Sequence, residues 1–251
     1  MSEDSAEGRA DPPVRRVRWK DARRIISTRH PPVDLFEDIA DPSDWDLIAA
    51  EEAKTNPRLI EQIGRLALVP PERRVSGPGA SYLMAPFVHI SPAYAGRFDD
   101  GTFGALYVAK SIETAIAETS HHRGKFYRAS KQKPGWFSQF RELIIPIDHR
   151  FHDLRGEAGF ADALSPDDYT VSQALAGRLR SAGSDGIVFP SVRDTRGECV
   201  AAFWPDVVGL PTQGRAFAYH FDGSIIDLVR DETSWDVWRL DRGKDESCVR
   251  R

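Results

Sequence analysis

The stretch GRFDDGTFGALYVAKSIETAIAET, residues 96–119, decides the fold because it joins a glycine-rich turn, a short apolar strand and a helix. Gly101 and Gly104 permit tight turns and a close approach of the backbone to a ligand. The run 105–109 is typical of a buried strand, and Ser111 is a favourable N-cap for the helix that follows it. The sequence therefore predicts a strand–helix unit whose preceding loop can fold around a ligand.

Three polar side chains of this unit are candidates for chemistry. Arg97 precedes the turn, Tyr107 lies in the strand, and Glu118 lies on the helix at the border between its apolar and polar faces. Each residue also has a structural explanation when taken singly. Arg97 could be a surface ion-pair partner, Tyr107 a strand core residue and Glu118 an exposed helix charge.

A second window, DGIVFPSVRD at residues 185–194, contains a strand that stops at Pro190. Proline cannot donate a ladder hydrogen bond, so we expect strand pairing to end there and to free Ser191 in the loop beyond it. A plain strand-end turn is the structural alternative. We do not expect a nucleophilic serine, because Ser191 lacks a G-x-S-x-G environment.

The rest of the chain indicates an α+β fold with several short strands, because the alternation of strands and helices is too irregular for a doubly wound sheet. Ser165-Pro166 is expected to open a helix that Gly183 closes, and Asp222-Gly223 predicts a hairpin. The strand-like runs are residues 82–89, 105–109, 143–147, 186–189 and 199–203.

The chain divides by composition into four parts. Residues 1–13 are polar and expected to be disordered. Residues 14–71 are expected to form a helical N-terminal extension, with one helix capped by Ser43 over Asp44 to Lys54 and another opened by Asn56-Pro57. Residues 72–240 are expected to form one domain that contains both windows, and residues 241–251 are expected to be a flexible tail.

The composition excludes several classes of protein. The 251 residues carry a formal net charge of −4 and contain no apolar run long enough to span a membrane. The polar N-terminus does not have the pattern of a signal peptide, so a cytoplasmic protein is expected. Cys199 and Cys248 are too few and too far apart for a disulfide scaffold or a zinc site, and His121 and His122 have no recognised ligand spacing. We expect no metal.

One basic stripe runs against the overall acidic charge. Residues 15–29 contain six arginines and one lysine interleaved with apolar side chains. Such a stripe could follow phosphates, but a solvated helix face is the simpler interpretation. We therefore do not expect direct binding of nucleic acid.

Together the two windows resemble the RES-domain family, named for its Arg, Glu and Ser, whose members act as toxins in bacterial toxin–antitoxin systems. The resemblance covers roughly residues 72–210 and rests on the stretch at 96–119 and on GIVFPSVRD with the following ECVAAFWP. Family members often have Gly-Gly-Arg-Trp and a later Asn-Val pair. This chain instead has Ala95-Gly96-Arg97-Phe98 and Cys199-Val200, which marks a divergent branch.

The resemblance implies an ADP-ribosyltransferase-like core of two small β-sheets with flanking helices and NAD+ in the cleft between them. The family's site residues map to Arg97, Tyr107, Glu118 and Ser191. A second NAD+-binding arginine near the start of the domain maps to Arg74, with Arg73 as the alternative.

Cleavage of the nicotinamide–ribose bond builds positive charge on the ribose, which explains these residue types. A carboxylate beside the ribose stabilises that charge, a role we give to Glu118. The ring of Tyr107 can stack on nicotinamide, and Arg97 can bind the diphosphate or the ribose. Ser191 can hydrogen-bond the ligand without competing for its charge.

The expected function is the toxin of a type II toxin–antitoxin system that degrades NAD+, its substrate, by phosphorolysis or hydrolysis. One alternative is a toxin that transfers ADP-ribose to an acceptor protein, and a second is a binding module without catalysis. The expected partner is a cognate antitoxin that resembles an Xre DNA-binding repressor. Trp235 and Trp238 could contribute to that contact, although core packing is the simpler use of them.

Overall fold

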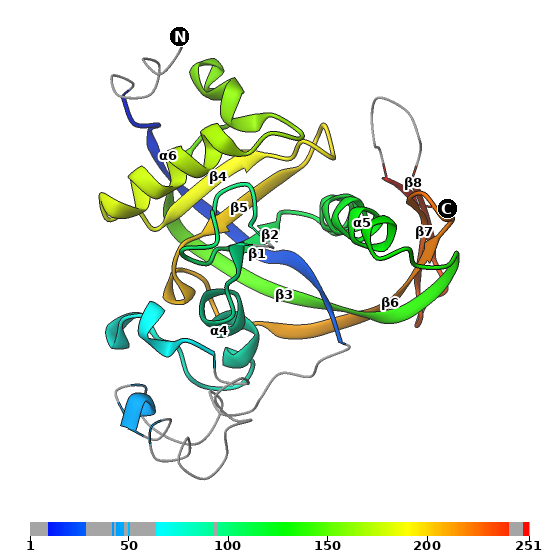
Figure 1. The fold of residues 1–251 in the computed structure, drawn as a ribbon, viewed down its shortest axis with the longest axis horizontal. Coiled ribbons are helices and arrows are strands. Elements are labelled where there is room, and N and C mark those ends of the chain that lie inside the picture. The colour runs from blue at the N-terminus through cyan, green and yellow to red at the C-terminus, as the bar shows by residue number, and fades with distance from the viewer. Residues whose placement is uncertain are drawn as a thin grey trace.

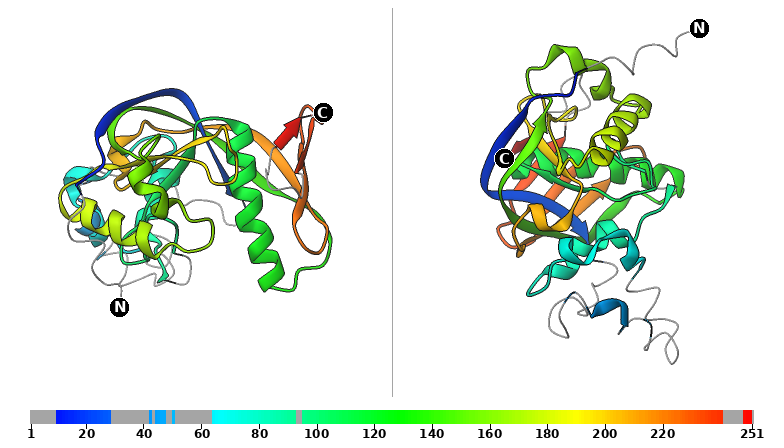
Figure 2. Two further views of the ribbon diagram at one scale, coloured as in Figure 1. Left: turned by 90° about the horizontal axis from the view of Figure 1, so that it is seen from above. Right: turned by 90° about the vertical axis from the view of Figure 1, so that its left-hand side faces the viewer.

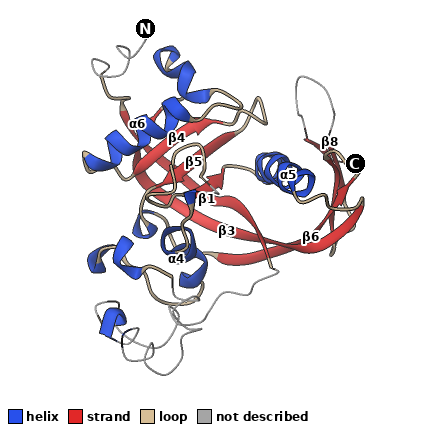
Figure 3. Cartoon of the chain, viewed as in Figure 1, coloured by secondary structure: helices blue, strands red, loops and turns tan. Residues whose placement is uncertain are grey.

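The computed structural model describes residues 10–28, 42, 44–47, 50, 64–92, 95–240 and 248–250. The strands are β1 (Val14–Ser27), β2 (Leu106–Ala109), β3 (Gly135–Asp153), β4 (Gly186–Pro190), β5 (Glu198–Ala202), β6 (Thr212–Phe221), β7 (Ile226–Asp231), β8 (Val237–Leu240) and β9 (Cys248–Arg250). The helices are α4 (Ala80–Val88), α5 (Ile112–Ala129) and α6 (Thr170–Ser181), with 3-10 turns η1 (Leu66–Leu68), η2 (Pro71–Arg73), η4 (Ala158–Leu164) and η5 (Pro205–Val207). Figures 1 and 3 show this mixture, which confirms the α+β class.

Five strands close into a ring because β1 pairs with a strand on each side. β1 runs antiparallel to β3, from Val14 opposite His152 to Ser27 opposite Phe140. It also meets β2 at one pair, Arg23 opposite Ala109. β2, β5 and β4 pair antiparallel in turn, and β4 returns to the end of β3 in parallel. The ring therefore joins the first strand of the chain to strands that follow much later.

The sheet continues beyond the ring because β3 has 19 residues and is long enough to belong to two parts. Its first half pairs antiparallel with β6, and β7, β8 and β9 follow in order. Figure 2 shows this second part bending away from the ring, with α5 between the two. The two small sheets expected from the sequence are thus joined by hydrogen bonds into one nine-stranded sheet within the described residues.

Helix α5 fills the angle between the two parts of the sheet. It packs against β1 and β2 on one side and against β6 and β7 on the other. Ser111 accepts a hydrogen bond from the backbone N–H of Thr114, which confirms the predicted N-cap. Tyr127 near its end contacts the ring of Phe221, at 5.4 Å between centroids. The helix carrying Glu118 is thereby fixed from both sides.

The predicted hairpin around Asp222-Gly223 is confirmed, with β6 and β7 on its two sides. The helix expected to open at Ser165-Pro166 begins later, at Thr170, because the side chain of Ser165 turns the chain by accepting the N–H of Asp168. Gly183 follows its end with φ of 87°, as a C-terminal glycine requires.

The prediction of a strand at residues 82–89 is wrong, because residues 80–88 form helix α4. Its buried apolar residues recur at helical spacing, at Ala80, Leu83, Met84, Phe87 and Val88. A short apolar run does not separate a buried strand from a buried helix, and here the period of 3.6 residues decides.

The helical extension expected over residues 14–71 is also wrong where the structure describes it. Residues 14–27 form β1, because the alternation of Val17 and Trp19 with charged neighbours has the period of a strand, and pairing with β3 overrides the helix propensity of the arginines. Residues 45–47 are helical, but most of the predicted helix 44–54 lies outside the described residues. The first part of the helix expected after Pro57, up to residue 63, also lies outside the described residues. Where the chain is described again, residues 66–68 form the 3-10 turn η1 in place of an α-helix.

Both chain ends differ from the expected flexible segments. Residues 1–9 lie outside the described residues, but Asp11 forms an ion pair with Arg178, and the carbonyl of Pro13 accepts the N–H of Asp153. Of the tail 241–251, residues 248–250 form β9 and pair with β8, so backbone pairing orders this end. No helix in the described part of the chain has the length and apolar character needed to cross a membrane.

The two C-terminal tryptophans have different environments. Trp238 is fully buried beside Phe217, which confirms its expected use in the core. Trp235 is 66% exposed, so the expectation of core packing is wrong for this residue.

The basic stripe of residues 15–29 forms ion pairs along β1. Arg16 and Arg18 both contact the carboxylate of Asp148 on the facing strand, at 2.5 and 3.3 Å. Arg23 donates to Glu142, which is 1% exposed and also accepts hydrogen bonds from Arg215. Burial favours the neutral form of Glu142, but the hydrogen bonds and charges of Arg215 and Arg23 hold its pKa below the usual value.

We expect Glu142→Ala to lower the free energy of unfolding by about 3–5 kcal/mol, because it leaves two guanidinium groups without their buried carboxylate. Urea denaturation at pH 7 measures this loss. Because the folded-state pKa is depressed, the carboxylate stabilises the fold above its unfolded-state pKa, and this contribution is lost as the pH falls through the folded-state value. The difference from the unsubstituted protein should therefore shrink in acid.

The matched control is Glu72→Ala, since Glu72 is exposed in η2. It should change the free energy of unfolding by less than about 0.5 kcal/mol. Equal effects of the two substitutions would show that the Glu142 network does not stabilise the joined sheet.

Candidate functional site

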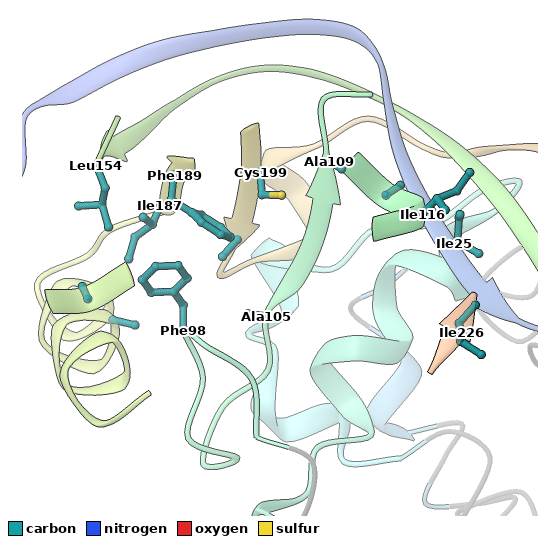
Figure 4. Close-up of a cluster of buried hydrophobic side chains, with 14 of the residues drawn as sticks. Ile25, Phe98, Ala105, Ala109, Ile116, Leu154, Ile187, Phe189, Cys199 and Ile226 are labelled. Atoms are coloured by element: carbon teal, nitrogen blue, oxygen red, sulfur yellow. The ribbon is translucent and has the colours of Figure 1, made fainter. Parts of the chain in front are cut away.

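The loop 95–105 places Arg97 at the edge of the ring. Phe98 anchors this loop in the core, with its ring edge-on to Phe189 of β4 at 4.8 Å between centroids. Figure 4 shows the two rings turned toward each other in the buried cluster. Gly104 is required for close approach, because a Cβ there would lie 2.0 Å from the carbonyl oxygen of Pro86. The predicted tight turn therefore packs directly on α4.

Tyr107 ties the same loop to β2. Its hydroxyl donates to Oδ2 of Asp99 at 2.8 Å and accepts the backbone N–H of Phe98 at 2.7 Å. Burial raises the pKa of Asp99 and, together with the charge of Asp99, raises the pKa of Tyr107 well above its usual value. Tyr107 therefore stays protonated and holds the backbone N–H of Phe98 and the side chain of Asp99, next to Arg97.

Glu118 meets Ser191 because the strand register brings two segments together. The pairing of β2, β5 and β4 sets the end of β4 near the end of β2, where α5 begins. Asp194, in the turn after β4, accepts a hydrogen bond from the hydroxyl of Thr114 at 2.7 Å. Two turns of helix from the Ser111 cap, Glu118 then accepts a hydrogen bond from Oγ of Ser191 at 2.6 Å.

Ser191 is held more tightly than the sequence indicated. β4 ends at Pro190, opposite Glu198, as predicted, but the N–H of Ser191 in the following turn still donates to the carbonyl of Gly197. The expected freed serine is therefore wrong: Ser191 is 7% exposed, because a tight turn encloses it. Its Oγ accepts the backbone N–H groups of Arg193 and Asp194, which directs its proton toward Glu118.

Arg97 lies close enough to Glu118 for their charges to interact. Its guanidinium donates to the carbonyl of Ser165 at 2.5 Å and lies 4.6 Å from the centre of the Tyr169 ring. Burial lowers the pKa of Arg97, and the nearby carboxylate of Glu118 opposes this shift. The structure thus brings Arg97, Tyr107, Glu118 and Ser191 together.

Arg193 belongs to this cluster, although the sequence analysis did not select it. It is 9% exposed, and its guanidinium donates to the carbonyl of Pro166 at 2.5 Å. Burial and then the charge of Arg193 lower the pKa of His121 to about 3, so that this imidazole is neutral at neutral pH. Arg193 stands two residues after Ser191 in the window 185–194. This closeness in sequence was the signal that could have identified Arg193 as a site residue.

Arg74, the predicted second NAD+-binding arginine, does not join the cluster. Its guanidinium is buried and donates to the carbonyl of Val69 at 3.0 Å and to the carboxylate of Asp46 at 2.9 Å. These contacts close the segment before α4, so they explain why an arginine is required there. The described contacts of Arg74 are therefore structural, and its contact with NAD+ stays a prediction.

Arg73, the alternative, is also remote from Ser191. It forms ion pairs with Asp185 and Asp206 and lies over the ring of Trp204. Asp185 precedes β4 and Ser191 follows it, so roughly 16 Å of extended strand separate the two positions. Among the described residues, no group of three or more His, Cys, Asp or Glu side chains is arranged to hold a metal ion.

The RES domain family matches residues 71–222. A relative from Sinorhizobium fredii (strain NBRC 101917 / NGR234), named "Uncharacterized protein y4oC", is 28% identical over 211 residues, which cover 82% of this chain and 85% of the relative. A chain of the M. tuberculosis MbcT-MbcA toxin-antitoxin complex is similar with a TM-score of 0.41 and 13% identity, over 83% of this chain and 87% of that chain.

We expect Tyr107→Phe to lower the free energy of unfolding by about 1–3 kcal/mol, because a buried carboxylate and a backbone N–H lose their shared partner. Tyr169→Phe is the matched control, since its hydroxyl forms no hydrogen bond with any described residue in the structure. The control should stay within about 0.5 kcal/mol of the unsubstituted protein. Urea denaturation compares the two variants, and indistinguishable midpoints would contradict the loop-holding role of Tyr107.

Proposed function

Since this chain belongs to the RES-domain family, we propose that it is the toxin of a toxin–antitoxin pair and that it binds NAD+ and cleaves the nicotinamide–ribose bond. The observation that carries the proposal is the hydrogen bond from Ser191 to Glu118, with Arg97 beside them. A half-buried carboxylate next to a buried guanidinium suits a ligand that carries a cationic sugar centre and a diphosphate.

In the proposed reaction the bond between the nicotinamide nitrogen and C1′ of the ribose breaks, and its electron pair leaves with nicotinamide. The ribose becomes oxocarbenium-like, and the carboxylate of Glu118 stabilises this charge. Phosphate or water then forms a bond to C1′ and releases a proton. The products are nicotinamide and ADP-ribose or its phosphorylated form.

Ser191 is proposed to act as a positioning residue for Glu118. Two backbone N–H groups fix its oxygen, so its hydroxyl hydrogen bond holds one carboxylate oxygen in place. Tyr107 is proposed to position the loop of Arg97, since its hydroxyl is committed to that loop and stacking on nicotinamide would need a free ring face. An ADP-ribosyltransferase-like core remains our proposal for the fold family.

Transfer of ADP-ribose to an acceptor protein is the alternative reaction. An added N-terminal surface could select such an acceptor, but residues 14–27 form a strand of the ring and not a separate extension, so this alternative has less support. Binding of nucleic acid by the stripe at 15–29 has less support as well, because carboxylates of β3 neutralise several of its arginines. We propose that a cognate antitoxin, resembling an Xre repressor, masks the site in the cytoplasm.

We expect Glu118→Gln to lower nicotinamide release from NAD+ by on the order of 10²-fold or more, because the amide carries no charge to oppose the cationic ribose. The control is Glu113→Gln on the first turn of the same helix, which should retain activity. Purified protein is incubated with NAD+ alone, with phosphate and with cell lysate, and nicotinamide and labelled ADP-ribose are followed.

Free ADP-ribose or its phosphorylated product without lysate supports NAD+ degradation. Label retained on a lysate protein would establish the transferase instead. If the unsubstituted protein releases no nicotinamide under any condition, the enzyme proposal fails and a binding module takes its place.

A further inference from the structure

Two buried arginines of the site share an unusual arrangement. The guanidinium of Arg97 donates to the carbonyls of Ala163 and Ser165, and that of Arg193 donates to the carbonyl of Pro166. Within the described part of the chain, neither arginine forms an ion pair with a carboxylate. Two cations are therefore held side by side on one backbone segment by neutral oxygens alone.

The carboxylates nearby are already engaged in other hydrogen bonds. Asp194 accepts from Thr114, and Asp99 accepts from Tyr107 and from the backbone N–H of Gly96. Glu118 accepts from Ser191. The positive charge of Arg193 adds to burial in lowering the pKa of Arg97, which shows that the two guanidinium groups repel each other. An anion placed between them would relieve this repulsion.

We propose that Arg193 and Arg97 together form a binding site for a diphosphate group, and that segment 163–166 occupies their donors until the ligand arrives. This inference rests on the proposed function, in which the diphosphate is that of NAD+. It replaces Arg73 and Arg74 by Arg193 as the second arginine that contacts the ligand.

The chemistry of the donors favours phosphate over the present partners. A guanidinium presents its N–H groups as a planar fork that matches two phosphate oxygens, whereas each carbonyl here takes a single hydrogen bond. Hydrogen bonds to a charged acceptor are also roughly twice as strong as those to a neutral one. Tyr169 covers one face of the Arg97 guanidinium and leaves the edge donors to the ligand.

The proposed diphosphate site also lies close to Glu118, the carboxylate assigned to the ribose. Arg193 follows Ser191 by two residues in one turn, and Ser191 touches the carboxylate assigned to the ribose. A diphosphate is joined directly to the ribose in a dinucleotide, so both parts can be held at once.

The test measures binding of inorganic diphosphate and of ADP-ribose to the full chain by calorimetry, so that it needs no turnover. Arg193→Met should weaken both affinities at least about 10-fold, because a charge-assisted pair is lost. Arg196→Met is the matched control, since Arg196 is exposed in the same turn. It should leave both affinities unchanged.

Arg193→Lys is a second, more conservative variant, which separates a loss of binding from a loss of folding. Lysine keeps the positive charge and removes the planar fork of N–H donors. This variant should bind diphosphate with an affinity between those of Arg193→Met and the unsubstituted protein, and thermal unfolding checks that each variant is folded. If folded Arg193→Lys and Arg193→Met bind diphosphate as tightly as Arg196→Met, or if the unsubstituted protein binds none, the inference is overturned.

The two proposals fail separately. Diphosphate binding that depends on Arg193, together with no cleavage of NAD+, would retain the anion site and overturn the proposed reaction. Cleavage of NAD+ with binding that does not depend on Arg193 would retain the reaction and overturn this inference.

Discussion

The antiparallel pairing of β1 with β3 is the constraint on which the rest of the structure depends. It brings the first strand to a position where it also meets β2, and this contact closes the ring. With the ring closed, the register of β2, β5 and β4 sets the turn after β4 beside the start of α5. The contact between Ser191 and Glu118 is therefore a result of strand register as much as of the two residue types.

The local signals in the sequence predicted local structure well. Ser111 caps its helix, Asp222-Gly223 forms its hairpin, and four of the five predicted strands match observed strands to within one residue or lie inside them, because each depends on neighbouring residues. The strand at 14–27 was missed because its partner lies more than a hundred positions later, and no local pattern reports such pairing. The run at 82–89 failed because short apolar segments suit helix and strand alike.

The candidate site was also predicted in part, where local sequence patterns pointed to it, and missed where tertiary contacts decide. Arg97, Glu118 and Ser191 were selected from their windows, and the fold brings them together. Arg193 was overlooked because an arginine in a turn has the pattern of an ordinary surface charge, and only its burial and its contact with Pro166 distinguish it. Arg74 was selected from its position in the family, whereas its contacts with Val69 and Asp46 give it a structural use.

The wide separation of β1 and β3 along the chain also sets when a newly made chain can assemble its candidate site. β1 emerges from the ribosome first, but its partner ends at Asp153, and β4 and β5 follow up to residue 202. At about 5–20 residues per second, tens of seconds can pass before the ring is complete. Because the ring aligns the cluster around Glu118, a chain that has not yet reached residue 202 lacks the strand pairing that assembles this cluster.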